Sequence, residues 1–294
     1  MKLHLLGTGV PEPSLKRASS SYLVRTGDDA ILFDHGPGAY RRLQEAGIHC
    51  TEVTHVFITH LHYDHCSDLI SLFLNRWDVG AGHLRPLEIY GPPGIQQFMD
   101  RLFGPEGAFA LDLEARTNHW SSLSLYEYRG GTGDRALPET AVTELAESDV
   151  VEGDGWRLTL ANVPHMQPYL VCYGYRLEGP DGVFAYSGDA GPCKAMHMLA
   201  HQADVLVHMC ARMNETEVDS SVMDKANSRH AAMPHLALAE LARDAQVKTL
   251  VASHFPPSTD RDGTRERTIA DMLEIYDGTL IWGEDLMEIP VKNN

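Results

Sequence analysis

Short apolar runs separated by turn residues fill the N-terminal part of the chain. Runs of this length, broken by Gly, Pro and Asp, are typical of β-strands, and we predict strands at residues 3–6, 21–24, 30–33 and 55–59. Between them, residues 39–46 predict a helix that ends at Gly47, since glycine readily takes the left-handed conformation just past a helix end. A longer helix is predicted to begin near Asp64 or Ser67, because the apolar residues that follow recur on one helical face: Leu69, Ile70, Phe73, Leu74 and Trp77.

The rest of the chain continues this mixture. We predict strands at residues 87–90, 156–161, 172–177, 183–186 and 247–252, and helices at residues 95–103 and 234–246. Residues 128–138 are rich in glycine and predict a flexible loop, but no domain boundary, because strand-like segments resume after them. Strands with interspersed helices in both halves predict a single layered α/β domain over residues 1–294.

The composition indicates which kind of substrate and which cellular compartment to expect. The chain carries 24 Lys and Arg against 41 Asp and Glu, a formal net charge of −17. Such a surface repels phosphate backbones, which makes long nucleic acid an unfavourable partner and favours small substrates. Five cysteines without a C-x-x-C pair indicate a reducing compartment. With no apolar signal segment and no membrane-length apolar stretch, we expect a cytoplasmic protein that does not contact a membrane.

The most informative segment lies between the predicted strand at 55–59 and the helix that follows. It places His60, His62, Asp64 and His65 within six residues. Imidazole nitrogens and carboxylate oxygens are the donors that zinc and similar divalent ions prefer, and two adjacent ions need both kinds. The positive end of the helix also suits the carboxylate of Asp64. The segment therefore predicts a metal site.

The run from His60 to His65 resembles the H-x-H-x-D-H signature of the metallo-β-lactamase superfamily. The family's other motifs are found in order along the chain, each at the end of a predicted strand: Asp34, His165, Asp189 and His254. The resemblance covers nearly the whole chain. It implies an αββα sandwich, an α/β fold in which two mixed sheets are flanked by helices, with metals at one edge of the sheets.

The resemblance also implies a role for each matching residue. His60, His62 and His165 would hold one ion, Asp64, His65 and His254 the other, and Asp189 would bridge them, while Asp34 would order the loop without binding metal. We expect two divalent ions, with zinc first, although the same donors accept manganese or iron. No cysteine stands at a ligand position.

Within the superfamily, several segments are similar to the ribonuclease Z branch. The loop with Lys16 and Arg17 matches one that approaches nucleic-acid phosphates in that branch, and His230 stands where the branch has a histidine that protonates the leaving group. His235 is a rival for the same role. However, only 23 residues separate His165 from Asp189, where ribonuclease Z carries a long arm that clamps tRNA. The resemblance thus implies an armless relative that acts on something smaller.

These observations predict a dinuclear metal-dependent hydrolase. A water shared by the two ions would have its pKa lowered from ~15.7 toward ~7, which yields a metal-bridging hydroxide at neutral pH, oriented by Asp64. We favour a small or short nucleotide-like phosphodiester as substrate. A carboxyl ester, lactone or β-lactam is the alternative, and tRNA 3′ processing ranks below both. A redox di-iron module is disfavoured because such proteins have an acidic residue in place of His62 and a flavin domain. We expect a homodimer only because dimers are the commonest oligomers of soluble proteins.

Overall fold

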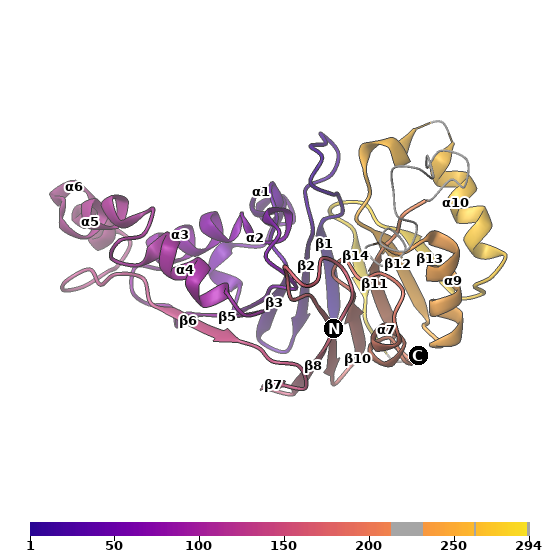
Figure 1. Ribbon diagram of the computed structural model, residues 1–294. Helices are drawn as coiled ribbons and strands as arrows, with labels where there is room; N and C mark the ends of the chain where they lie inside the picture. The colour runs from indigo at the N-terminus through magenta and orange to yellow at the C-terminus, as the bar shows by residue number, and fades with distance from the viewer. Residues whose placement is uncertain (213–231, 262, 293–294) are drawn as a thin grey trace.

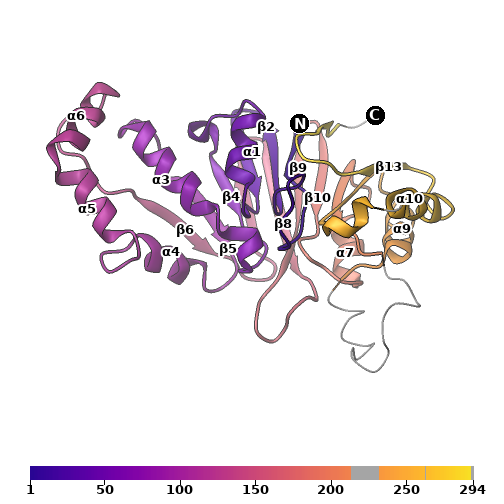
Figure 2. The same cartoon turned by 90° about the horizontal axis from the view of Figure 1, so that it is seen from above.

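The computed structural model describes residues 1–212, 232–261 and 263–292. Its centre is a pair of seven-stranded mixed sheets that lie face to face, with helices on both outer faces (Figures 1 and 2). This arrangement confirms the predicted αββα sandwich.

The first sheet is formed by the N-terminal half of the chain together with the last strand. Its strands, in spatial order, are β14 (Glu288–Pro290), β1 (Lys2–Gly7), β2 (Ser21–Thr26), β3 (Asp29–Phe33), β4 (His55–Phe57), β5 (Leu87–Gly91) and β6 (Thr140–Glu144). Pairing is antiparallel from β14 to β3 and parallel from β3 to β6. The pairing of β14 with β1 brings the two ends of the chain together.

The second sheet is formed by the C-terminal half. Its strands, in spatial order, are β13 (Thr279–Trp282), β12 (Thr249–Ser253), β11 (Val205–Met209), β10 (Gly182–Tyr186), β9 (Tyr173–Gly179), β8 (Trp156–Asn162) and β7 (Val150–Gly153). The four strands β10 to β13 are parallel, and β7 to β10 are joined by antiparallel pairing.

The helices divide between the two outer faces, as the view from above shows (Figure 2). The first sheet is covered by α1 (Ala39–Glu45), α3 (Leu69–Gly80), α4 (Ile95–Phe103) and, farther out, α5 (Ala110–Asn118) and α6 (Trp120–Tyr128). The second sheet is covered by α7 (Lys194–Leu199), α9 (His235–Asp244) and α10 (Thr264–Leu273). Three short elements complete the described chain: η1 (Cys50–Glu52), α2 (Tyr63–Cys66) and η2 (Pro257–Asp260).

Alternation along the strands builds the core on both sides of each sheet. In β3, Ile31 and Phe33 face the second sheet, whereas Ala30 and Leu32 pack toward the helices. Successive side chains point to opposite faces of a strand, so a strand covered on both faces reads as a continuous apolar run. Phe33 is at the centre of the inter-sheet layer, 5.1 Å from the Phe184 ring and 5.7 Å from the Phe57 ring between centroids.

Most predicted elements are present, but four helices and the strands β6, β7 and β13 of the described chain were not predicted. The predicted strands and the helices at 39–46, 95–103 and 234–246 appear with ends shifted by a few residues, and the helix after the histidines is split into α2 and α3. The missed helices are α5, α6, α7 and α10. In α6, Trp120, Leu125 and Tyr128 are exposed, so its sequence lacks a single apolar face. Residues 129–139 connect α6 to β6 without helix or strand. The flexibility of this connection stays a prediction.

Among the described residues, none of the helices has the length and apolar character that a bilayer crossing requires.

The inter-sheet aromatic layer should dominate stability. Phe33 is fully buried, so Phe33→Ala should lower the free energy of unfolding by about 3–5 kcal/mol, through lost burial and the cavity left behind. Urea denaturation followed by circular dichroism measures this change. Leu111→Ala, on a side chain that is 81% exposed, is the control and should change stability by less than about 0.5 kcal/mol. Equal effects of the two changes would contradict this assignment of the core.

Candidate metal centre

Four segments that are far apart in the sequence meet at one edge of the sandwich. The first runs from the end of β4 into α2, and the others directly follow β8, β10 and β12. In the second sheet β8, β10 and β12 run in the same direction, so the residues after their carboxyl ends emerge on the same edge. The seven residues predicted as metal ligands lie here in two groups: His60, His62, His165 and Asp189, and Asp64, His65, Asp189 and His254.

The first group is rich in nitrogen donors. His60 Nε2 lies 2.9 Å from His62 Nδ1, and His62 Nδ1 lies 3.3 Å from His165 Nε2. The carboxylate of Asp189 closes the group, with Oδ2 3.9 Å from His60 Nε2 and 3.7 Å from His165 Nε2. Three imidazoles and one carboxylate oxygen form a donor set that suits zinc.

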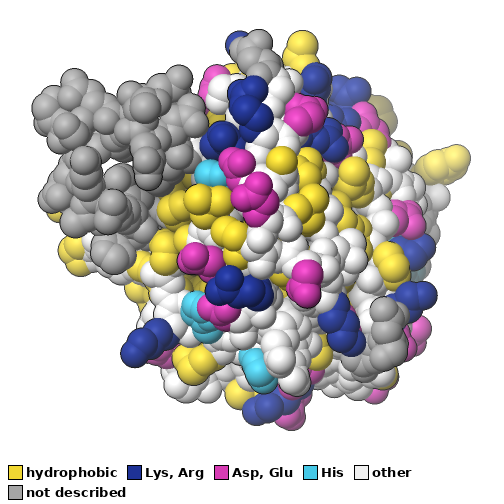
Figure 3. Space-filling model, turned by 90° about the vertical axis from the view of Figure 1, so that its right-hand side faces the viewer, with side chains coloured by type: hydrophobic (Ala, Val, Ile, Leu, Met, Phe, Trp, Pro, Cys, Tyr) yellow, Lys and Arg dark blue, Asp and Glu magenta, His cyan; other side chains and the backbone are white. Residues whose placement is uncertain are grey.

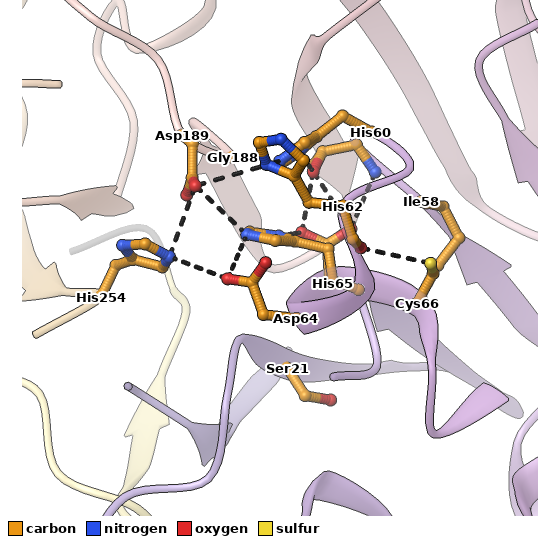
Figure 4. Close-up of polar contacts among 12 residues, drawn as sticks. Ser21, Ile58, His60, His62, Asp64, His65, Cys66, Gly188, Asp189 and His254 are labelled. Carbon is orange, nitrogen blue, oxygen red and sulfur yellow. Dashed lines mark hydrogen bonds and ion pairs between the residues drawn. The ribbon is translucent and has the colours of Figure 1, made fainter. Parts of the chain in front are cut away.

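The second group adds a further carboxylate. His65 Nε2 lies 3.4 Å from Asp64 Oδ2 and 3.3 Å from Asp189 Oδ2. His254 Nε2 approaches the same two oxygens, each at 3.4 Å. Figure 4 shows the side chains of His254, His65 and His60 directed at the carboxylate of Asp189, which both groups therefore share.

Burial of these donors supports a metal-binding role. His65 is 0% exposed and Asp189 is 4% exposed. His65 Nε2 and Asp189 Oδ1 have no hydrogen-bond partner among the described residues. Buried polar atoms are nearly always satisfied, so two unpartnered ones in a cluster of nitrogen and oxygen donors fit a divalent ion.

Asp34 is hydrogen-bonded to residues of the centre but belongs to neither donor group. It follows β3 in the left-handed conformation, with a φ of 56°, and is fully buried. Its carboxylate accepts hydrogen bonds from Thr59 N at 2.7 Å, from Tyr186 OH at 2.7 Å and from His65 Nδ1 at 2.7 Å. Because His65 donates its Nδ1 proton to Asp34, its Nε2 faces Asp64 and Asp189 as the metal-facing atom.

Thr59 orients the next histidine in the same way. Its hydroxyl donates to Asp34 Oδ2 at 2.8 Å and lies 2.9 Å from His60 Nδ1. The hydroxyl therefore accepts the Nδ1 proton of His60 and directs Nε2 toward Asp189. Thr59 and Tyr186 were not singled out from the sequence. Their signal was position alone, since Thr59 directly precedes His60 and Tyr186 ends the strand before Asp189.

Electrostatics in the cluster are strongly coupled. Burial lowers the pKa of His65, but the carboxylates of Asp189 and Asp34 outweigh burial and raise it well above its usual value. Burial alone would raise the pKa of Asp189, yet the surrounding histidines, with His254 first, hold it well below the usual range. Metal binding replaces the proton on an imidazole, so ions and protons compete for these atoms.

Two glycines allow the segments to approach. Gly36 packs against the backbone of Asp64, and an added Cβ at Gly36 would lie 1.8 Å from the carbonyl oxygen of Asp64. Gly188 has a φ of +53°, and an added Cβ there would lie 3.0 Å from Thr59. A larger residue at either position would separate Asp34 or Asp189 from the histidine run.

Cys66 lies next to the centre as a structural thiol. Its Sγ donates to the carbonyl oxygen of His62 at 3.2 Å, and burial raises its pKa to about 12. Within the described chain, neither donor group contains a cysteine, as the sequence indicated.

The remaining predicted site residues are placed differently. Lys16 is exposed, whereas Arg17 is buried and donates to Asp260, Thr8 Oγ1 and the carbonyl oxygen of Gly283. Contact of Lys16 or Arg17 with substrate stays a prediction. His235 Nε2 lies 3.4 Å from Asp271 Oδ2. His230 lies outside the described residues.

Comparison with known proteins identifies the family. A family model described as "Beta-lactamase superfamily domain" matches residues 29–255, a span that contains both donor groups. The chain belongs to the metallo-β-lactamase superfamily. With its histidine and aspartate cluster, this superfamily member is a metal-dependent hydrolase.

The relatives agree with the resemblance to ribonuclease Z. A protein named ribonuclease Z from Mycobacterium sp. (strain KMS) is 32% identical over 258 residues, which cover 87% of this chain and 85% of the relative. The metallo-β-lactamase fold protein YhfI from Bacillus subtilis superposes with a TM-score of 0.71 at 18% identity, covering 98% of each chain. Human tRNase Z, short form, superposes with a TM-score of 0.67 at 21% identity, covering 100% of each chain. The two structural likenesses show the fold alone.

The chain between His165 and Asp189 is short, the feature from which the sequence predicts an armless relative. Between His165 and Asp189 the described chain contains a loop and the antiparallel hairpin of β9 and β10. The hairpin pairs within the second sheet, while the ten-residue loop at 163–172 that precedes it lies outside the strands and exposes Tyr169.

The support from Asp34 can be tested without changing the backbone. Asparagine also tolerates the left-handed conformation, so Asp34→Asn removes the charge but suits the local fold. Its amide cannot accept all the bonds that Asp34 accepts, and zinc affinity should fall about 10–100-fold. Competition with a chromophoric chelator measures the affinity. Asp68→Asn is the control, because the Asp68 carboxylate accepts from Tyr40 N and, among the described residues, belongs to neither donor group. Unchanged zinc affinity in Asp34→Asn would remove Asp34 from the centre's support.

Proposed function

We propose that this metal-dependent hydrolase cleaves a phosphodiester bond in a small or short nucleotide-like substrate, with two divalent ions, zinc first, held at the shared carboxylate of Asp189. The observation that carries the proposal is the position of Asp189 Oδ2, which lies 3.3–3.9 Å from imidazole nitrogens of both donor groups. A pair of adjacent ions is a recurring arrangement for displacement at phosphorus, because it can stabilise both the attacking and the leaving oxygen.

The relatives support a phosphodiester over an acyl substrate. Ribonuclease Z is the name of the mycobacterial relative, and the alignment with it covers 85% of that protein. Cleavage of RNA by a nuclease is phosphodiester chemistry, so the same bond type is the simplest expectation for this chain.

The chain's own residues have distinct tasks in this proposal. Bound ions would supply Lewis acidity and lower the pKa of a water molecule. Asp64 and Asp189 would accept hydrogen bonds from that water and keep it oriented, while Asp34 and Thr59 fix the two histidines whose Nδ1 atoms they contact. Protonation of the leaving oxygen is assigned to His230. Its rival His235 has its Nε2 directed at Asp271, which favours His230.

RNA remains a second candidate because the relatives carry the name ribonuclease Z. The net charge of −17 opposes a long polyanion. On the face drawn in Figure 3, dark-blue Lys and Arg side chains stand among magenta Asp and Glu side chains, without forming a broad patch of one sign among the described residues. We therefore place short substrates first. Homodimerisation stays a prediction.

The deciding experiment compares substrates. Zinc- and manganese-loaded protein is given a chromogenic phosphodiester, a chromogenic carboxyl ester or lactone, and a tRNA precursor at two salt concentrations. Faster turnover of the small diester supports the proposal. Efficient cleavage of the precursor with a steep loss at higher salt would favour the RNA candidate, since phosphate contacts are salt-dependent. Acyl cleavage with a silent phosphodiester would refute both.

Removal of a shared or buried ligand should abolish activity through metal loss. Asp189→Ala takes a donor from both groups and His60→Ala takes one from the first, so both variants should lose bound metal and turnover while remaining folded. Elemental analysis, circular dichroism and the diester assay give the three readouts. His201→Ala, at an exposed histidine, should match the wild type. Full metal content with full turnover in Asp189→Ala would show that the ligand assignment is wrong.

Measuring the bound metal distinguishes a lost general acid from a lost metal ligand. His230→Ala should retain both ions and slow turnover by about 10²–10⁴-fold, the range for a lost general acid. His235→Ala should have little effect on rate. The reverse result would transfer the role to His235, and two unchanged rates would show that neither histidine performs it.

A further inference from the structure

Arg17 is a buried cation whose partners come from three distant segments. Its side chain lies in the N-terminal loop, yet Nε and Nη2 donate to the two carboxylate oxygens of Asp260 at 3.0 and 2.9 Å. Nη1 donates to Thr8 Oγ1 at 2.7 Å and to the carbonyl oxygen of Gly283 at 2.6 Å. Every nitrogen of the guanidinium therefore has a partner within the chain. Arginine can form a bidentate pair of hydrogen bonds with a carboxylate, and lysine cannot.

The segment that Arg17 holds begins at a metal ligand. His254 directly follows β12 with a φ of 59°, in the left-handed region that is uncommon for residues other than glycine. The next residue, Phe255, is fully buried, and its backbone N–H donates to the carbonyl oxygen of Thr8 at 2.8 Å. Asp260, the carboxylate partner of Arg17, ends the short helix η2 that follows. The chain from His254 to Asp260 is thus fixed at both ends.

The ring of Phe255 reinforces the same attachment. It stacks on Trp282 with 3.9 Å between centroids and 9° between planes, and the guanidinium carbon of Arg17 lies 5.1 Å from its centroid. The Thr8 hydroxyl, which accepts the hydrogen bond from Arg17, donates its own hydrogen bond to Asp285 Oδ1 at 2.7 Å. Arg17 therefore connects the residue after His254 to the N-terminal loop and to the C-terminal turn in one network.

We propose that Arg17 is a positioning residue that holds His254 in its left-handed conformation at the second donor group, through Phe255 and Asp260. The network touches none of the residues of the first donor group among the contacts of the described chain. Its effect should therefore fall on the ion bound by Asp64, His65, Asp189 and His254, and spare the ion bound by His60, His62 and His165.

The test measures the two zinc affinities separately, by stepwise competition with a chromophoric chelator. Arg17→Gln should weaken one of the two ions by about 10–100-fold, the usual effect of losing a residue that supports a ligand, and leave the other unchanged. Arg17→Lys keeps the charge but loses the bidentate pair of hydrogen bonds, and should show an intermediate loss. His254→Ala should weaken the same ion, and adding Arg17→Gln to it should cause no further loss, because the two changes act through one ligand.

A merely structural role is distinguished by a matched arginine. Arg135 is also buried, pairs with Asp78 and lies 4.1 Å from the ring of Trp77, but it is on the α3 side of the molecule. Arg135→Gln should lower the melting temperature and leave both zinc affinities at the wild-type values. If Arg17→Gln does not fold, Thr8→Val removes the hydroxyl beside it and should weaken the same ion to a smaller degree. Equal weakening of both ions, or a loss in Arg17→Gln that adds fully to that of His254→Ala, would overturn the proposal.

Discussion

The carboxylate of Asp189 is 4% exposed and is approached by imidazoles from three other segments, and the cost of placing a charge there governs the surrounding structure. A buried charge is tolerated only where partners replace the lost water. For Asp189 the partners are histidines that belong to the β4–α2 connection and to the ends of β8 and β12. Both sheets must therefore be assembled before this carboxylate is compensated, which ties the centre to the complete sandwich and not to one local motif.

Asp34 meets the same requirement on the other side of His65. It is fully buried directly after β3 of the first sheet, yet one of its partners, Tyr186, ends a strand of the second sheet. The hydrogen bond between them crosses the inter-sheet layer at the metal edge, next to the aromatic rings that fill its centre. The hydrogen bond between Asp34 and Tyr186 therefore joins the two sheets at the edge where the donors meet, beside the ring of Phe33, which packs against Tyr186.

The donors could be predicted from the sequence through the resemblance to the metallo-β-lactamase superfamily, and hydrophobic patterning placed the later ones at strand ends, while their binding of metal stays a prediction. His165, Asp189 and His254 each follow an apolar run, and the runs correspond to β8, β10 and β12. The helix α6 could not be found in this way, because its apolar side chains do not share one face. Arg17 shows a different limit. Its partners Asp260 and Gly283 are 243 and 266 residues away along the chain, and a basic residue in a loop carries no sign of such partners.

The metal donors and the residues that support them have different roles. Imidazoles and carboxylates at this spacing select a class of ion and thereby a class of hydrolysis, whichever bond is cleaved. The supporting residues contact different parts of the chain. Asp34 and Thr59 lie next to the histidine run, whereas Arg17 is hydrogen-bonded to the N-terminal loop, to the segment after His254 and to the C-terminal turn. The anchor points of Arg17 all lie at the edge where the strands end and the donors meet, since Thr8 follows β1 and Gly283 follows β13. Binding of an ion at His254 is therefore linked to the ordering of the segments that Arg17 joins, because ion affinity includes the free energy of ordering the segments that hold the ligands.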